Sequence, residues 1–202
     1  GLLKYNPAFS VRSTAVAGGN LWLNRWRQST KKSIATSKCT DNQPNGVKTI
    51  LVSLVLSVPK LLLEAISASP STWVWMLRFH PTRNKENRAV DMSQCLGTGH
   101  PGVEFERSNN SHLYELLNDC DIHVTEASTC ALEALAFGVQ SVILGGSEYF
   151  GDSGKFIYQS FIEKKLMFSA DNSSELISAI NSARLIDKTD PAIVDSFVDN
   201  NA

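Results

Sequence analysis

Residues 120–138 of this 202-residue chain read CDIHVTEASTCALEALAFG. The first third is short and apolar enough for a buried strand, and the last part has the length and composition of a helix that ends at a glycine. A strand followed at once by a helix is one unit of an α/β fold. The stretch therefore predicts a strand-to-helix turn that contains Glu126, Ser128 and Thr129.

The same alternation extends on both sides of this turn. Apolar runs of strand length predict strands, and apolar residues at helical spacing predict helices between them. We expect strands at 48–56, 72–80, 102–107, 121–126, 139–145 and 166–170, and helices at 59–68, 111–120, 129–138, 153–166 and 173–186. Parallel strands need crossover connections, so the pattern predicts an α/β fold with a doubly wound parallel sheet covered by helices.

The chain divides into two parts by composition. Residues 1–46 predict a short strand, a turn at Gly18 and Gly19, a short helix and then a polar stretch without periodicity, which together are typical of a linker segment. Residues 47–202 are expected to form one compact domain. Because residue 1 is Gly, we expect the chain to be a piece of a longer protein.

Bulk composition argues against several functional classes. Lys and Arg number 19 against 20 Asp and Glu, so no net positive field would recruit nucleic acid. The four cysteines lie far apart and have no CxxC spacing, which argues against a metal site or a disulfide framework and suits a cytoplasmic protein. The most apolar segment, 49–66, is interrupted by Pro59, Lys60 and Glu64, so no transmembrane segment is predicted.

Several candidate ligand contacts follow the expected second strand. Arg78 and His80 stand at its end, just before Pro81, and Arg83 follows the turn. Ligands of open parallel sheets bind beyond the carboxyl ends of the strands, so these side chains are placed to contact a phosphate or a base. Two alternatives stay open: His80 as a structural turn residue, and the arginines as solvated surface groups.

The turn after residue 125 supplies the other candidates. Ser128 and Thr129 stand at the expected start of a helix, where their hydroxyls would either cap the helix or hold a phosphate. Glu133 lies on an otherwise apolar helix, and a carboxylate there needs a partner. A ribose diol would satisfy it, as would an internal ion pair, for instance with Arg78.

These residues carry a resemblance to a known group of enzymes. The motif LRFHP and residues 113–144 resemble the C-terminal, nucleotide-sugar-binding half of GT-B type glycosyltransferases and the related UDP-GlcNAc 2-epimerases. The resemblance covers residues 47–180 and implies a Rossmann-like domain. It implies that His80 meets the nucleotide or its phosphate, as in the HP motif of bacterial capsule transferases. It also implies that Glu126 takes the place of the acid or small polar residue that follows the strand in these families, that Ser128 and Thr129 contact the phosphate, and that Glu133 holds the ribose.

The resemblance implies a donor-binding domain of a glycosyltransferase in surface polysaccharide biosynthesis, with a CMP-, CDP- or UDP-linked sugar as substrate. An N-terminal acceptor domain would be missing, the chain alone would be inactive, and peripheral membrane association of the full enzyme stays open. No catalytic residue is assigned, and neither a metal nor a cofactor is expected. The alternatives are an epimerase-like enzyme and a non-catalytic Rossmann-like binding or regulatory domain.

Overall fold

The computed structural model describes residues 46–146 and 151–186, which lie in one compact unit. Strands and helices alternate throughout. Their bounds are β1 Lys48–Leu54, α4 Lys60–Ala68, β2 Trp73–Phe79, α5 Lys85–Leu96, β3 Val103–Glu104, α6 Glu106–Asn110, α7 Leu113–Asp119, β4 Ile122–Thr125, α8 Cys130–Ala136, β5 Ser141–Leu144, α9 Ser153–Glu163, β6 Met167–Ala170 and α10 Ser173–Ser182. The predicted linker segment, 1–46, lies almost wholly outside the described residues, and so does the end of the predicted domain.

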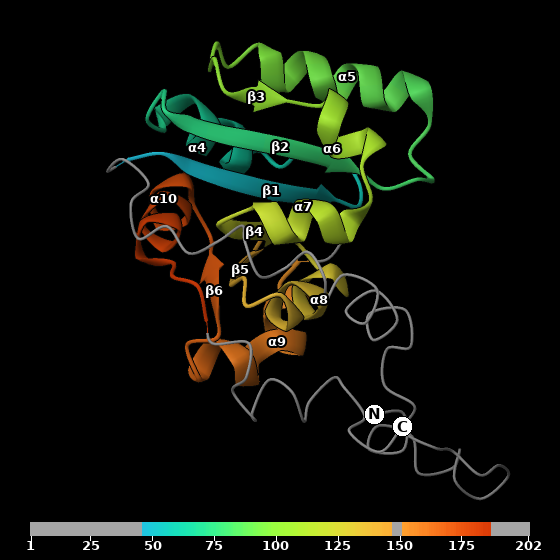
Figure 1. The fold of residues 1–202 in the computed structure, drawn as a ribbon. Coiled ribbons are helices and arrows are strands. Elements are labelled where there is room, and N and C mark those ends of the chain that lie inside the picture. The colour runs from blue at the N-terminus through green and yellow to red at the C-terminus, as the bar shows by residue number, and fades with distance from the viewer. Residues whose placement is uncertain (1–45, 147–150, 187–202) are drawn as a thin grey trace, which may run out of the picture. The chain divides into compact units, whose positions relative to one another are not determined.

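The described strands form one six-stranded parallel sheet in the order β3-β2-β1-β4-β5-β6 (Figure 1). The chain moves from β1 outward through β2 to β3, then returns to the other side of β1 and continues through β4 and β5 to β6. This order is that of a doubly wound, Rossmann-like sheet, as the sequence predicts. The strand order therefore runs in opposite directions from β1, through β2 on one side and through β4 on the other.

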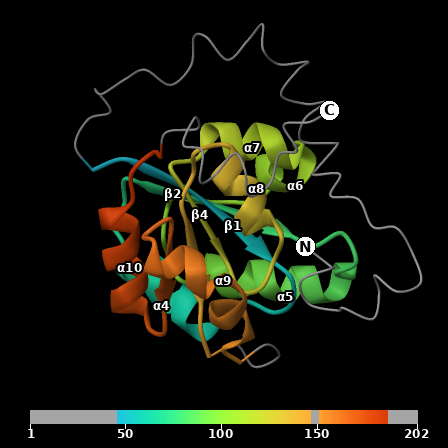
Figure 2. The ribbon, with the colours of Figure 1, turned by 90° about the horizontal axis from the view of Figure 1, so that it is seen from below.

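Helices cover both faces of the sheet. In Figure 2, α6, α7 and α8 lie on one side of the central strands, and α4, α5 and α10 lie on the other. Because helices cover both faces, β1 is buried without a break from Ile50 to Leu54, and its residues there are apolar except Ser53.

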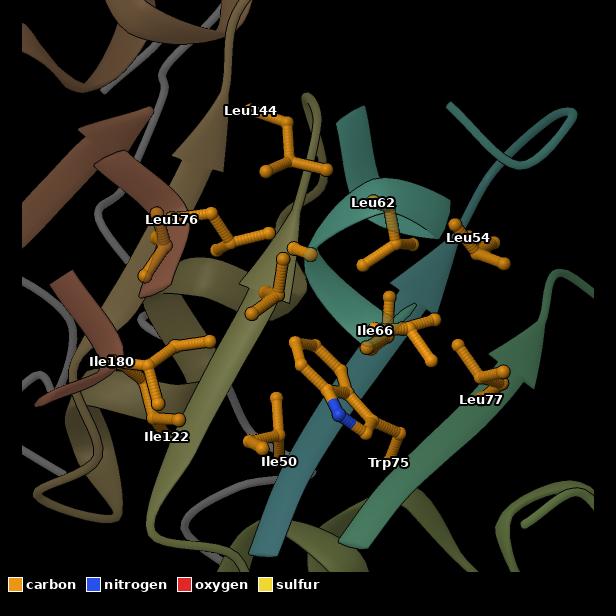
Figure 3. Packing of buried hydrophobic residues seen from close by; sticks show 14 of the residues in the cluster. Ile50, Leu54, Leu62, Ile66, Trp75, Leu77, Ile122, Leu144, Leu176 and Ile180 are labelled. Atoms are coloured by element: carbon orange, nitrogen blue, oxygen red, sulfur yellow. The ribbon is translucent and has the colours of Figure 1, made fainter. Parts of the chain in front are cut away.

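The main hydrophobic core fills the face that α4 and α10 cover. Leu62 and Ile66 of α4 and Leu176 and Ile180 of α10 pack on alternate residues of the strands, including Trp75 (Figure 3). All of these side chains are fully buried. Residues of the central strands that point to the opposite face include polar side chains as well as apolar ones, and these are part of the candidate site.

Two helices are absent from the sequence prediction. α5 carries few apolar residues and buries only Asp91 and Cys95, so its pattern lacks the apolar stripe that marks a surface helix. α6 is five residues long. Strands β1 and β4 also end before the predicted limits, at Leu54 and Thr125, and β3 has two residues where the sequence indicates a longer strand.

Candidate functional site

The centre of the sheet contains a topological switch point. β1 pairs with β2 on one side and with β4 on the other, and Ser53 near the end of β1 is in register with both Arg78 and Thr125. The connections after β1 and β4 lead to α4 and α8, which lie on opposite faces of the sheet, so the carboxyl ends of these two strands border a crevice where ligands of such sheets bind (Figure 2).

Arg78 lies at the switch point and is partly held by the protein. Its Nη1 donates to the backbone carbonyls of Ser108 (2.6 Å) and Ser111 (2.8 Å), which fixes the connection between α6 and α7. Burial lowers the pKa of this guanidinium, an effect that a Coulombic interaction with Cys130 partly offsets. Within residues 46–146 and 151–186 it forms no ion pair, so the anticipated internal pair with Glu133 is not formed there.

His80 belongs to an exposed turn. Its Nδ1 lies 2.7 Å from Thr82 Oγ1 and accepts a hydrogen bond from the Thr82 N–H at 3.3 Å. The turn also holds Arg88, which the sequence did not single out, because Arg88 donates to the carbonyls of His80 and Pro81. His80 therefore has a structural role in this turn, and its contact with a ligand stays a prediction.

Arg83 is engaged within the protein. Its Nε and Nη2 donate to the two carboxylate oxygens of Asp91 on α5, at 2.9 and 3.1 Å. Asp91 is 1% exposed, so this pair is buried and bidentate. Asp91 therefore occupies the Nε and Nη2 edge of the guanidinium, so Arg83 is not a fully solvated surface group, and its contact with a diphosphate stays a prediction.

The hydroxyls after β4 differ in their contacts. Ser128 Oγ accepts a hydrogen bond from the Cys130 N–H at 3.3 Å, and the Ser128 carbonyl accepts from the Tyr158 hydroxyl at 2.7 Å. Thr129 is exposed and occupies the cap position of α8 without a side-chain hydrogen bond to the helix. Ser128 thus satisfies a backbone group at the start of α8, as the capping alternative predicts, whereas Thr129 does not.

The two glutamates lie in different surroundings. Glu126 is 3% exposed, and its carbonyl packs directly against Gly154 at the start of α9. Glu133 is half-buried on α8, and its Oε1 accepts a hydrogen bond from the hydroxyl of Tyr114 on α7 at 3.0 Å. The partners of Glu133 thus include the neutral hydroxyl of Tyr114. The sequence could not indicate this contact, because Tyr114 belongs to another helix.

Cys130 marks the point at which these side chains converge. Burial raises the pKa of its thiol and Glu133 raises it further, while interactions with Ser128, Arg78 and Ser53 lower it. The ends of β1, β2 and β4 and the first turns of α8 therefore contribute to one cluster around this sulfur. The sequence indicated only core packing for Cys130, yet the residue is half-buried and adjoins the polar groups of the site.

His123 is the functional candidate that the sequence reasoning passed over. It is fully buried in β4, and its ring nitrogens lie 3.0 Å from Ser141 Oγ and 3.0 Å from Ser53 Oγ. The signal was a histidine inside an apolar strand, but its partners come from β1 and β5 and are distant in sequence.

No metal cluster and no membrane span is found in the part of the chain that the structure describes. Groups of three His, Cys, Asp or Glu residues that could ligate an ion are absent there. None of the helices described has both the length and the apolar character that crossing a bilayer requires.

No protein-family model matches this sequence, and no curated protein matches it. In structure, the chain is similar to HepE from Anabaena in complex with UDP-glucose, with a TM-score of 0.48 and 15% identity over 79% of this chain and 42% of that one. It is similar to the UDP-GlcNAc 2-epimerase from Neisseria meningitidis bound to UDP-GlcNAc, with a TM-score of 0.46 and 12% identity over 82% and 45% of the two chains.

A third similar structure is the wall teichoic acid polymerase TagF, with a TM-score of 0.45 and 16% identity over 87% of this chain and 40% of that one. The chain thus spans less than half the length of each of these three proteins. They include an epimerase of the kind that residues 113–144 resemble. A proposal about the ligand of this chain therefore has to rest on its own side chains.

Proposed function

We propose that the described domain binds a nucleotide sugar at the carboxyl ends of β1, β2 and β4. In this proposal it is the donor-binding domain of a GT-B type glycosyltransferase that acts in surface or capsular polysaccharide biosynthesis in the cytoplasm. The observation that carries the proposal is the guanidinium of Arg78, which stands at the switch point without a carboxylate partner among the described residues.

Arg78 is suited to a phosphate because of how it is held. Two carbonyls fix Nη1, while Nε and Nη2 form no hydrogen bond within the part of the chain described. A guanidinium offers donors in a planar fork that matches phosphate oxygens. A positive charge that is partly removed from water also gains more from an anionic ligand than an exposed one would.

Glu133 supports recognition of the ribose. Its carboxylate accepts hydrogen bonds only, and the hydroxyl of Tyr114 orients one of its oxygens. A diol donates two hydrogen bonds to such a group. Arg78 and Glu133 both interact electrostatically with the thiol of Cys130, which supports a site that has a positive and a negative group near this residue.

In glycosyl transfer, these residues would bind and orient the donor. Arg78 would stabilise the charge that develops on the departing phosphate, and the site would hold the sugar in position for attack. A base that activates the acceptor hydroxyl is not assigned to this domain. It would come from an acceptor domain outside this chain, which is why the chain alone is expected to bind without turnover.

Binding of nucleotides to the full 202-residue chain tests the proposal. We expect one of CMP, CDP, UDP and GDP to raise the melting temperature, because a ligand that binds only the folded state stabilises it. Arg78→Lys keeps the charge but loses the fork, and we expect it to weaken binding about tenfold. Glu133→Gln should do the same.

Two matched variants serve as controls for charge and for general stability. Arg107→Lys changes an exposed arginine that pairs with Asp119, and Glu115→Gln changes an exposed carboxylate on α7. Both should leave affinity unchanged. Absence of a shift with all four nucleotides, or equal losses in the variants and their controls, would favour a non-catalytic domain over a donor-binding one.

A further inference from the structure

A chain of polar side chains crosses the buried face of the sheet below the candidate site. Ser53 on β1, His123 on β4 and Ser141 on β5 follow one another, with 3.0 Å between Ser53 Oγ and Nε2 and 3.0 Å between Nδ1 and Ser141 Oγ. Ser141 Oγ also donates to the carbonyl of Ala131 on α8 at 3.5 Å. His123 and Ser141 are fully buried, and Ser53 is 8% exposed.

The chemistry of these three side chains determines the direction of the hydrogen bonds between them. Burial lowers the pKa of His123 to about 3, so the ring is neutral and has one donor and one acceptor. A carbonyl only accepts, so the Ser141 hydroxyl uses its proton on Ala131 and accepts from Nδ1–H. Nε2 is then the acceptor, and the Ser53 hydroxyl donates its proton to it. All three donors are satisfied in this arrangement.

A hydroxyl that donates its proton in this way keeps two lone pairs with which it accepts hydrogen bonds. The proton of Ser53 is directed to His123. Ser53 is in register with Arg78 on β2, so its side chain lies on the same face of the sheet as this residue of the site.

We propose that the Ser53–His123–Ser141 chain fixes the Ser53 hydroxyl as a hydrogen-bond acceptor for a hydroxyl or N–H group of the bound ligand. The proposal rests on the proposed function, since it assigns one contact within the nucleotide-sugar site. Ser53 would contact a sugar, ribose or base rather than a phosphate, because phosphate oxygens at neutral pH are acceptors. His123 is a positioning residue, since it acts only through Ser53.

The direction of the hydrogen bonds can be measured without any ligand. Nitrogen-15 and carbon-13 NMR of the full chain, labelled at histidine, distinguishes the two neutral tautomers of the ring. We expect the His123 ring to carry its proton on Nδ1. A proton on Nε2 would make Ser53 a donor toward the site and would overturn the proposal.

The contact of Ser53 with a ligand is tested by nucleotide affinity. The nucleotide used is whichever of CMP, CDP, UDP and GDP stabilises the wild type most. Ser53→Ala should lower affinity about tenfold, within the range for a hydrogen bond in a desolvated site. Thr125→Val is the matched control, because it removes a buried hydroxyl that donates to the Ser53 carbonyl at 2.9 Å and leaves the Ser53 hydroxyl in place. Its affinity should stay within about twofold of the wild type.

Variants of His123 separate positioning from general stability. His123→Gln offers an acceptor near the position of Nε2 and should retain affinity, whereas His123→Leu should lose it about as far as Ser53→Ala does. In the double variant the two losses should not add, because both remove the same contact. Circular dichroism of each variant confirms that the fold persists.

The outcomes distinguish this proposal from the proposed function. A wild type that binds nucleotide while Ser53→Ala binds equally well would overturn the contact and leave the proposed function standing. A wild type that binds none of the four nucleotides would overturn both the proposed function and the contact, and the tautomer measurement would then decide the direction of the polar chain alone.

Discussion

The hydroxyl of Tyr114 donates to Oε1 of Glu133 across 3.0 Å and so connects α7 to α8 beside the switch point. Tyr114 is 6% exposed, and its ring packs against Phe137 with 5.5 Å between centroids. The hydroxyl therefore has little freedom, and the carboxylate that accepts from it is held in one orientation before a ligand arrives.

Replacing Tyr114 by Phe removes this hydroxyl and keeps the ring. We expect nucleotide affinity to fall by about three- to tenfold, as loss of one hydrogen bond predicts, because Glu133 then has to be ordered on binding. Titration calorimetry measures the change. In a Glu133→Gln background the same replacement should have little further effect, and a full additional loss would show that Tyr114 acts elsewhere.

The state of His123 predicts a dependence of stability on pH. Burial holds the pKa of His123 at about 3, below the unfolded value of 6.5, so the unfolded chain binds a proton that the folded chain does not. The stability from the neutral ring is fully present above about pH 6.5 and is lost as pH falls toward 3, by about 1.4 kcal/mol per pH unit.

Urea unfolding between pH 4 and 7 measures this effect as the difference between wild type and His123→Gln. The wild type should lose stability more steeply on acidification. Equal slopes for the two proteins, or an imidazole resonance of His123 that titrates near pH 6, would contradict the buried neutral ring.

The Arg83–Asp91 pair predicts a large loss for a small substitution. Asp91→Asn leaves a guanidinium without its buried bidentate partner, and we expect about 3 kcal/mol of destabilisation. Glu64→Gln is the control, because the Lys60–Glu64 pair is exposed, with 90% and 49% of the two side chains accessible. Exposed pairs contribute little, so it should change stability by less than about 0.5 kcal/mol. Chemical denaturation compares the two.

Gly154 predicts a packing effect at the start of α9. A Cβ at this position would lie 2.3 Å from the carbonyl oxygen of Glu126 and 3.1 Å from Ile143 Cγ2, so α9 would have to move away from the end of β4. We expect Gly154→Ala to cost about 1–3 kcal/mol, although alanine is the better helix former. Ser160→Ala on the exposed side of the same helix should be neutral or slightly stabilising in thermal unfolding.

The alternation of strands and helices was predictable because strands covered on both faces are apolar along their whole length. The run from Ile50 to Val52 in β1 shows this. α5 was not predictable, because its two buried residues are Asp91 and Cys95, whereas its apolar residues Val90 and Leu96 are exposed. The buried partner of Asp91 is Arg83, and an ion pair leaves no hydrophobic pattern.

For the site, the sequence placed Arg78, Ser128 and Glu133 near one another, and their shared interaction with Cys130 agrees with that placement. It could not indicate the partners that decide what each side chain does. Ser108 and Ser111 hold Arg78, Tyr114 holds Glu133, and Asp91 occupies Arg83. These contacts join separate elements, and no periodicity within one element encodes them.

The position of β1 between β2 and β4 also sets the order in which the molecule can assemble. β1 finds its first neighbour soon after it is made, because β2 follows within one helical crossover. Its second neighbour comes much later, and the contact between Ser53 and His123 joins residues 70 positions apart. Pairings of such long range are slow to form, since the loop between them must be closed first. During synthesis, the end of β1 therefore stays without its second neighbour until β4 has emerged.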